Sequence, residues 1–580
     1  MKPWITRVPP PPRSIRKHGL IHENPNKLKS LHKNKLGHRE RYANCAHLTY
    51  LLILRSNRLE LSPVDDAAAI AARGGFTTFV GSTLSLLIRA AGGILVARML
   101  SPSEYGLFAI VLVAPGLFGV FSDWGVNSAL TRFTARYRAE GKPWRVRELV
   151  RVSFLFKLAV GGALSLALFL SADLLAAFML NRPEIGGFVR MVSLIILSQS
   201  IYNTSLSVLA GMELMDRRAM VNISQSVVKG ICSPILVYIG LGVSGAIIGY
   251  VLSYAVAASV GFILTFSSTQ ERSTQFEEKS GFQDTLRIMM VFGSPLFLGG
   301  LIGGLVGRFR SILLTWFASN DMIGNLNVAS QFTVLVGLVT NSIGIALYPI
   351  FSKFNHSMEP EKTRAAFRSS VRYSTMIVLP YVALIAALSK PGIYTLFSEK
   401  YPQAPLYLSL LMIPQLLVGL GSLSIGLFLY SQGDTKTSLK IGAINSGISL
   451  LLSPFFIWKW GVEGLITSGI VLSLTGNFMG LYVLHKKYSI SPDLRHTWRT
   501  LLCSAFSVGL AYGVVRLLPS LTKLLILFIG SGVFLAAHLV LAPVTGALEK
   551  RDIENLDLML RELRIIYPLA RLLLGLEEKI

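Results

Sequence analysis

Cysteine is almost absent from this 580-residue chain, and the motifs of common enzymes are absent altogether. Cys45, Cys232 and Cys503 lie far apart and show no Cys-x-x-Cys or other ligand-type spacing, so the sequence predicts neither a disulfide framework nor a metal site. A P-loop, a His-Glu-x-x-His sequence and a Gly-x-Ser-x-Gly sequence are also missing. ATP hydrolysis and common hydrolase chemistry therefore have no visible site, and we predict a protein that is not an enzyme, without catalytic residues or a cofactor.

Charged residues are scarce as well. They make up 15% of the chain against 52% hydrophobic residues, and the mean hydropathy is +0.54, which is too apolar for a soluble globular protein. Apolar runs of about 20 residues recur, each long enough to cross a hydrocarbon core of roughly 30 Å as a helix, and they predict an all-α polytopic membrane protein with about 14 transmembrane helices. The predicted helices cover residues 74–98, 104–131, 148–180, 185–212, 217–240, 242–266, 284–317, 321–351, 365–389, 403–430, 434–458, 460–484, 496–517 and 521–546.

The charges that are present are mostly basic and give a net charge of +25. They gather in the first sixty residues and in the loops after the even-numbered predicted helices, for example Arg136, Arg138 and Lys142 after the second. Basic loops stay in the cytoplasm. This bias predicts a multi-pass protein of the cell membrane with both termini in the cytoplasm, and it explains the charge without a nucleic-acid partner.

The sequence contains an internal repeat. Residues 81–133 and 299–351 have the same plan of two apolar segments joined by a short polar turn, with Gly106 and Gly324 at equivalent positions. Gly-Val-Ser-Gly at 242–245 matches Gly-Val-Glu-Gly at 461–464, and Ser-Pro at 233–234 matches Ser-Pro at 453–454. These offsets of 218 to 220 residues predict two pseudo-symmetric six-helix lobes in parallel orientation, with the transport path between them.

The predicted domains follow from this repeat. They are a basic cytoplasmic segment at 1–62, a first lobe at 74–266, a second lobe at 284–484, an additional helix pair at 496–546 and a cytoplasmic amphipathic helix at 549–576. We interpret 1–62 as a disordered tail, as sequence ahead of a later start, or as an arm that binds anionic lipid headgroups. The apolar stripe of 549–576 is typical of a helix that lies in the membrane interface.

The first turn carries a family resemblance. Residues 97–106, ARMLSPSEYG, resemble the A-R-x-L-x-P-x-E-Y-G signature of polysaccharide-type flippases of the multidrug/oligosaccharidyl-lipid/polysaccharide exporter superfamily. The Gly-Val-x-Gly sequences at 242 and 461 and the region 324–329 look similar to the same family, so that the resemblance covers roughly residues 74 to 550. It implies a V-shaped pair of helical bundles that moves a polyprenyl-linked sugar across the membrane by alternating access.

Cations inside the predicted helices are the candidate site residues, because ionisable groups are costly in a membrane and usually face protein or water. The deepest are Arg89, Lys157, Lys229, Arg308 and Arg310, and Arg308 falls within one residue of the position equivalent to Arg89. A phosphate needs compensating charge, and arginine offers paired donors without losing its proton. We hypothesise that Arg89, Arg308 and one or both lysines hold the phosphate of a lipid-linked oligosaccharide between the lobes. Arg310 is a further candidate, although about 200° around a helix separates it from Arg308.

Structural roles are the alternative for each of these residues. The cations could extend to the membrane surface or pair with a structural acid. Asp123 is the candidate for binding a coupling proton or sodium ion, and its alternative role is a contact at a helix end. The glycines between 299 and 307 predict close helix packing or a bending helix that gates the cavity.

Together these features predict an ATP-independent flippase that moves a polyprenyl-(di)phosphate-linked oligosaccharide from the cytoplasmic to the outer face for polysaccharide biosynthesis. Its expected partners are this substrate, membrane lipids and polysaccharide-assembly proteins. A cation-coupled multidrug exporter of the same fold is one alternative, but it would need acids in its cavity. A membrane glycan polymerase or ligase would carry a large external loop, and every predicted external loop is short. A non-transporting scaffold would leave the paired arginines unexplained.

Overall fold

The structure of the protein is a computed structural model that describes residues 63–269, 281–354, 356–518 and 521–549, together with 552 and 554. The basic segment at 1–62 and nearly all of the helix predicted at 549–576 lie outside the described residues. The chain divides into two units, Met1–Ala71 and Ala72–Ile580. Apart from the start of the first helix at Pro63, the features described below belong to the second unit.

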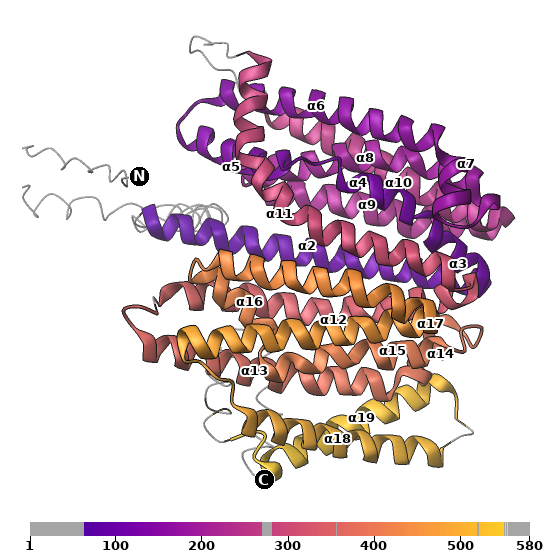
Figure 1. Cartoon of the computed structure of the whole chain (residues 1–580), viewed down its shortest axis with the longest axis vertical. Helices are drawn as coiled ribbons and strands as arrows, with labels where there is room; N and C mark the ends of the chain where they lie inside the picture. Colours follow the sequence, from indigo (N-terminus) through magenta and orange to yellow (C-terminus); the bar gives the residue numbers. More distant parts are fainter. Residues whose placement is uncertain are drawn as a thin grey trace, which may run out of the picture. The chain divides into compact units, whose positions relative to one another are not determined.

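The regular elements of the described ranges are helices, and the long ones run side by side (Figure 1). The elements before the first internal gap are α2 (Pro63–Met99), α3 (Pro102–Val111), α4 (Val113–Val120), α5 (Val126–Ala139), α6 (Pro143–Leu170), α7 (Ala172–Leu174), η2 (Leu175–Met179), η3 (Pro183–Ile185), α8 (Gly186–Gly211), α9 (Met215–Leu236), η4 (Val237–Leu241) and α10 (Gly242–Ser268). Those after it are α11 (Phe282–Phe317), α12 (Asn320–Lys353), α13 (Pro360–Ala387), α14 (Ser389–Phe397), α15 (Ala404–Met412), η5 (Ile413–Leu420), α16 (Ser422–Ser431), α17 (Thr435–Val483), η6 (Leu484–Tyr488), α18 (Leu494–Leu517) and α19 (Lys523–Thr545).

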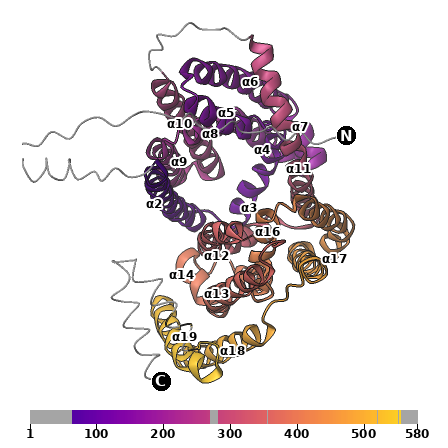
Figure 2. The ribbon, with the colours of Figure 1, turned by 90° about the vertical axis from the view of Figure 1, so that its left-hand side faces the viewer.

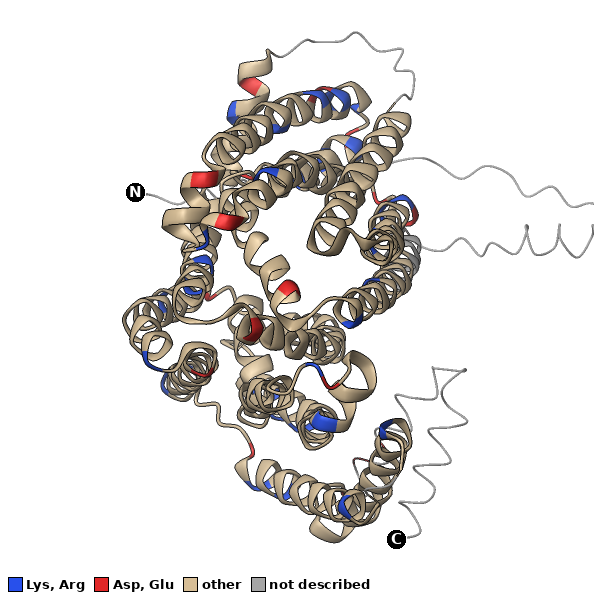
Figure 3. Ribbon diagram, turned by 90° about the vertical axis from the view of Figure 1, so that its right-hand side faces the viewer, with Lys and Arg blue, Asp and Glu red and all other residues tan. Residues whose placement is uncertain are grey.

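Eleven helices in the described ranges are long and apolar enough to cross a membrane. The number rises to 12 if Ala404–Leu420 and Ser422–Ser431, which meet at a bend of 53°, count as one broken span. Lysine, arginine and the acids occupy few positions along these helices (Figure 3). The prediction of an all-α polytopic membrane protein is confirmed.

Two of the eleven, Met215–Ser268 and Thr435–Tyr488, are 54 residues long and each contains a break at a glycine. Gly242 has φ 51° and ψ −130°, and Gly461 has φ 55° and ψ −121°. Only glycine adopts this backbone without strain. The two Gly-Val-x-Gly sequences that the repeat aligns therefore have the same unusual local conformation, and each one starts a new straight segment.

The two matched polar turns also have the same structure. Ser101 caps α3 with φ −70° and ψ 161°, and Ser319 caps α12 with φ −71° and ψ 161°. One turn further along, Gly106 and Gly324 bring the two helices into contact. A Cβ atom on Gly106 would lie 1.8 Å from the carbonyl oxygen of Asn320, and one on Gly324 would lie 3.1 Å from the amide nitrogen of Gly106. The duplicated turns thus pack on each other, and α3 and α12 lie side by side (Figure 2).

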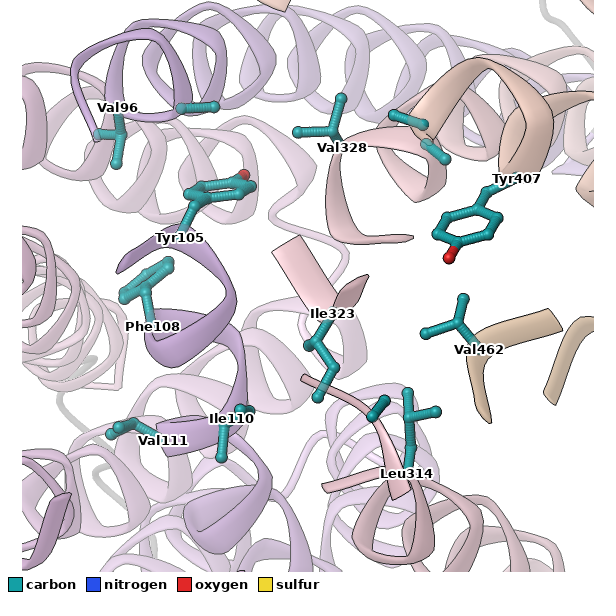
Figure 4. Close-up of a cluster of buried hydrophobic side chains, with 14 of the residues drawn as sticks. Val96, Tyr105, Phe108, Ile110, Val111, Leu314, Ile323, Val328, Tyr407 and Val462 are labelled. Carbon is teal, nitrogen blue, oxygen red and sulfur yellow. The ribbon is translucent and has the colours of Figure 1, made fainter. Parts of the chain in front are cut away.

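A cluster of buried apolar side chains surrounds this contact. Tyr105 and Phe108 of α3 lie near Ile323 and Val328 of α12, and further members come from α2, α11, α15 and α17 (Figure 4). Between membrane helices, association depends on such packing more than on removal of apolar surface from water. The cluster therefore holds the first and second copies of the repeat together at the end of the helices where the turns lie, which we call the turn end.

Helix α11 differs from the expected packing. It contacts α4, α5 and α6 as well as α17, and its close approach is at Gly293, where the backbone of Gly125 lies so near that a Cβ atom on Gly125 would be 2.0 Å from the Gly293 oxygen. No neighbouring described atom lies within 4 Å of a Cβ built on Gly299, Gly303 or Gly307. The prediction of close packing at these three glycines is wrong, because two of them, Gly303 and Gly307, line a wide cavity.

Candidate functional site

A cavity of about 350 Å³ lies between α2, α3, α9, α10 and α12. We call it the cationic cavity. It is lined by Leu86, Arg89, Ala90, Gly92, Gly93, Val96, Tyr105, Phe108, Leu112, Lys229, Ser233, Ala246, Tyr250, Asn327, Gln331, Val334 and Leu335. Its walls therefore come from both copies of the repeat.

Two cations enter this cavity from neighbouring helices. Helices α2 and α9 touch where a Cβ on Gly92 would lie 2.5 Å from the Cα of Gly230, and this contact places Arg89 beside Lys229. The Arg89 guanidinium donates a hydrogen bond to Ser226 Oγ at 3.2 Å. The Lys229 Nζ lies 4.4 Å from the centroid of the Tyr250 ring, a favourable cation–π geometry.

No acidic group among the described residues compensates the charge of this pair. None of the described lining residues is acidic, and neither Arg89 nor Lys229 forms an ion pair within the described part of the chain. The polar groups nearby are neutral, such as Gln331, whose amide donates to the Tyr105 hydroxyl at 3.3 Å. A cavity with two cations and no acid requires water or an anionic ligand to satisfy it.

Arg308 lies beside this cavity but is not part of its lining. Its guanidinium rests on α4, where a Cβ atom on Gly116 would be 2.7 Å from Arg308 Nη1. The Arg308 side chain is exposed, and Leu112, the residue directly before α4, lines the cavity. The glycine on α4 thus makes room for a cation from the second copy of the repeat.

Arg310 points elsewhere, as its separation from Arg308 around the helix implies. It lines a second cavity of about 710 Å³ between α11, α12, α15, η5 and α17. Its Nη2 donates to the Leu465 carbonyl at 2.9 Å and to Ser468 Oγ at 3.2 Å. The structure therefore assigns the two arginines to different surroundings.

Lys157 is paired with the candidate coupling residue. Its ammonium is buried, with 1% of the side chain exposed, and it lies 2.6 Å from Asp123 Oδ1. It also donates to the carbonyl oxygens of Ser122 at 3.0 Å and Asp123 at 3.2 Å. The structure thus brings Arg89 and Lys229 into one cavity with Arg308 beside it, and it separates Lys157 and Arg310 from them.

Sequence reasoning did not single out Tyr105, Tyr250 or Gln331, which complete the cavity. Tyr105 belongs to the turn motif, and Tyr250 lies in an otherwise small and aliphatic stretch of α10. An aromatic hydroxyl or an amide inside an apolar helix was the available signal. For metals, no group of three or more His, Cys, Asp or Glu side chains among the described residues could hold an ion.

Hydrogen bonds join the first and second halves of the chain at the turn end, directly after Val96 of the cavity wall. Arg98 Nε donates to the Leu396 carbonyl at 2.6 Å, and Arg98 Nη2 donates to the carbonyl of Thr395. Lys400 Nζ donates back to the Arg98 carbonyl at 2.8 Å, and the Tyr401 hydroxyl donates to the Ala97 carbonyl at 2.7 Å. We call these bonds, with the Gly106–Gly324 contact, the turn-end latch.

Known proteins resemble this chain in sequence. The family model of polysaccharide biosynthesis proteins matches residues 95–406, more than half of the chain. The probable lipid II flippase MurJ of Bdellovibrio bacteriovorus is 28% identical over 210 residues, which cover 34% of this chain and 39% of that protein, so the match spans well under half of its length. The lipopolysaccharide biosynthesis protein WzxC of Escherichia coli is 22% identical over 412 residues, 70% of this chain and 78% of that protein.

Solved structures show the same fold. A lipid II flippase MurJ in an inward closed conformation matches with a TM-score of 0.62 at 16% identity, covering 80% of this chain and 98% of that one. An inward-facing multidrug resistance MATE family transporter of the MOP superfamily matches with a TM-score of 0.59 at 18% identity, covering 70% and 94%. The chain therefore belongs to the polysaccharide biosynthesis protein family, and it has the fold of MOP superfamily transporters.

Proposed function

We propose that the protein is an ATP-independent flippase that moves a polyprenyl-phosphate- or diphosphate-linked oligosaccharide from the cytoplasmic to the outer face of the membrane. The observation that carries the proposal is the cationic cavity, in which Arg89 and Lys229 have no acid among the described lining residues. An anionic phosphate supplies the missing charge. The names of the related proteins, a lipid II flippase and a lipopolysaccharide biosynthesis protein, support a lipid-linked glycan as the cargo.

Each cation has a distinct role in this proposal. The planar guanidinium of Arg89 offers two parallel N–H donors to phosphate oxygens. Lys229, held against the face of Tyr250, supplies a compact second charge. Arg308 reaches over Gly116 from α11 and is placed to join them if the two lobes approach. Lys157 is left out, because Asp123 already neutralises it.

We further propose that the chain crosses the membrane 14 times, in two six-helix lobes and an additional pair. A continuous helix of 54 residues would be about 81 Å long, far more than a hydrocarbon core of roughly 30 Å. The breaks at Gly242 and Gly461 divide Met215–Ser268 and Thr435–Tyr488 into two crossings each. The positions of the basic loops support an orientation with both termini in the cytoplasm and the turn end at the outer face.

In this orientation the turn-end latch is an outer gate in its closed state. Transport requires the gate to open after the substrate's phosphate has bound and the opposite end has closed. A multidrug exporter, the alternative within this fold, is less well supported: Asp123, the acid expected to couple it to a cation, is occupied by Lys157 at 2.6 Å.

Charge reversal in the cationic cavity tests the proposal. Arg89→Glu, at unchanged expression, is expected to abolish surface-glycan assembly and to make lipid-linked sugar accumulate on the cytoplasmic side. Arg516→Glu is the matched control, because Arg516 is exposed at the end of α18 and stacks on Tyr512 outside both cavities. Normal glycan in the Arg89 variant would overturn phosphate binding at this site.

Cysteine labelling tests the orientation separately. A cysteine in place of Ser103 at the turn end should react with a membrane-impermeant maleimide added outside the cell, and one in place of Lys142 should react only after permeabilisation. The reverse pattern would place the latch in the cytoplasm.

A further inference from the structure

The second cavity, which Arg310 lines, is polar but nearly uncharged. We call it the neutral groove. Its volume of about 710 Å³ adjoins a further cavity of about 390 Å³, with which it shares Gln415, Asn445 and Ser473. Serine, asparagine and glutamine side chains recur in both linings, and neither contains an acid or a lysine among the described residues.

The neutral groove is the repeat counterpart of the cationic cavity. Positions 220 and 219 residues apart line the two: Lys229 in the cationic cavity corresponds to Ser449 in the groove, and Tyr250 corresponds to Gly469. The duplication has therefore kept a cavity at the same place in each copy and changed its chemistry. A lysine and an aromatic ring in the first copy are replaced by a hydroxyl and a glycine in the second, where Arg310 Nη2 would lie 3.5 Å from a Cβ atom on Gly469.

Several polar groups of the groove and of the cavity that adjoins it, whose lining includes Asn477, have unused hydrogen-bonding capacity. Asn477 is 6% exposed, and neither its amide nitrogen nor its amide oxygen has a partner within the described residues. Arg310 Nε is likewise buried without a partner there. Asn445 Oδ1 accepts from Thr475 at 3.1 Å, which leaves its amide nitrogen for another acceptor. Buried donors and acceptors without partners are destabilising, so these groups need water or a ligand that both donates and accepts.

The two cavities adjoin the same helix. Ser330 of α12 lines the groove, and the next residue, Gln331, lines the cationic cavity. Successive residues point about 100° apart around a helix. A ligand whose phosphate is held at Arg89 and Lys229 would therefore have the groove on the adjoining face of α12, within reach of the part that extends beyond the phosphate.

We propose that the neutral groove binds the sugar chain of the substrate, an uncharged polyhydroxyl group, while the cationic cavity binds the phosphate. Sugar hydroxyls both donate and accept, as do the amides and hydroxyls of the groove. An acyl or prenyl chain would leave these groups unsatisfied. This inference rests on the proposed flippase function and adds a division of labour between the two copies of the repeat.

The test uses the full chain, purified in detergent, and two matched probes. One is lipid-linked oligosaccharide extracted from membranes of the source cells, and the other is the lipid phosphate left after mild acid has released its glycan. Binding of both is measured by the change in tryptophan fluorescence. The native protein is expected to bind the glycosylated probe at least tenfold more tightly than the bare lipid phosphate.

The double substitution Asn445→Leu with Asn477→Leu should abolish this tenfold preference and leave the affinity for the bare lipid phosphate unchanged. The matched control is Asn341→Leu, the same change at an exposed position of α12 outside both cavities, and it should keep the preference. Gln415→Leu, a single change in the groove, serves if the double variant does not fold.

The outcomes separate the two proposals. A native protein that binds both probes equally, or a groove variant that keeps the full preference, overturns the sugar-binding role of the groove. The double variant Arg89→Ala with Lys229→Ala should bind both probes more weakly, and to the same extent. If both bind this variant as tightly as the native protein, the phosphate site itself is wrong, whatever the groove variants do.

Discussion

Lys157 and Asp123 are a membrane ion pair whose role can be decided at the level of single residues. Lys157 is 1% exposed and Asp123 38%, so removal of the acid strands a buried ammonium that retains two carbonyl acceptors. We expect Asp123→Ala to lower the free energy of unfolding by about 3 kcal/mol, measured by thermal or denaturant unfolding in detergent. The double variant Lys157→Met with Asp123→Ala should lose less stability than Asp123→Ala alone, because it leaves no buried charge.

A matched control comes from a second ion pair in the first half of the chain. Asp173 and Arg190 form an ion pair in which the side chains are 64% and 47% exposed, so Asp173→Ala should cost under about 1 kcal/mol. If Asp123 binds a coupling ion instead, Asp123→Asn will abolish transport while the stability stays unchanged. That result would contradict a structural role for the pair.

Asp434 lies before the start of α17, outside the membrane-spanning segments, and its environment predicts that the stability of the protein depends on pH. Burial alone would raise the pKa of this carboxyl, but hydrogen bonds from Lys487, Thr437 and Tyr488 outweigh it and hold the pKa below its ordinary value of 3.8. A lowered pKa in the folded state means that the stabilisation is complete above the ordinary pKa. It is lost as the pH falls through the lowered folded value.

We therefore expect Asp434→Asn to lower the free energy of unfolding by about 1 kcal/mol at neutral pH, since the Lys487 side chain is half exposed. The difference from the native protein should shrink below about pH 4, in unfolding curves measured across the acidic range. Glu361→Gln removes an acid that is 83% exposed and should change neither the stability nor its slope with pH. An undiminished effect of Asp434→Asn at low pH would exclude the ion pair as its cause.

The individual site residues were only partly predictable from the sequence. The cost of a charge in an apolar helix identified Arg89 and Lys229, which share a cavity. The same rule could not distinguish Lys157 from the residues of the cavity, because the sequence does not show that α6 brings its ammonium to within 2.6 Å of Asp123. Helical spacing did separate the directions of Arg308 and Arg310, but it could not name the neighbours that each one meets.

At the scale of helices and turns, the contact between Gly106 and Gly324 predicts a gate that a single methyl group can disturb. A Cβ atom on Gly106 would lie 1.8 Å from a backbone oxygen of α12, so Gly106→Ala must push α3 and α12 apart. We expect a loss of about 1–3 kcal/mol of stability and a turn end that opens more often. A cysteine in place of Val96, which is 4% exposed in the cavity wall, should then react faster with a maleimide added at that end.

Gly509→Ala is the control for this substitution. Gly509 lies in α18, and no neighbouring described atom is within 4 Å of a Cβ built there, so the variant should match the native protein in both measurements. Unchanged reactivity at position 96 in the Gly106 variant would show that the glycine contact does not control access.

These elements were the most predictable part of the fold. The repeat aligns Gly106 with Gly324 and Gly242 with Gly461. The first pair is in contact, and the second pair shares a backbone conformation. Turn and break positions depend on local sequence, so a duplicated sequence reproduces them. The prediction of close helix packing at the glycines from 299 to 307 was wrong because small residues permit close packing without requiring it. What surrounds α11 depends on the helices around it, which no local pattern specifies.

At the scale of the whole molecule, alternating access predicts that the two ends of the helices move in opposite senses. Spin labels at positions 103 and 321 report on the turn end, where α3 and α12 begin. Labels at the exposed positions Ala135 and Ser352 report on the opposite end. Arg98→Ala with Lys400→Ala removes three of the hydrogen bonds of the turn-end latch and should favour the open turn end.

Distances between these labels, measured by double electron–electron resonance, should lengthen at the turn end and shorten at the opposite end in the latch variant. The reciprocal change matters, because local fraying of the latch would lengthen the first distance and leave the second unchanged. Lipid-linked oligosaccharide should shift the native protein in the same direction only if it binds the turn-end-open state more tightly than the closed one. The cationic cavity supplies a physical reason for such a preference, because opening lets Arg308, which now rests on Gly116, change its distance from Arg89 and Lys229. A substrate effect on both distances that disappears in Arg89→Ala would connect phosphate binding to the movement of the lobes.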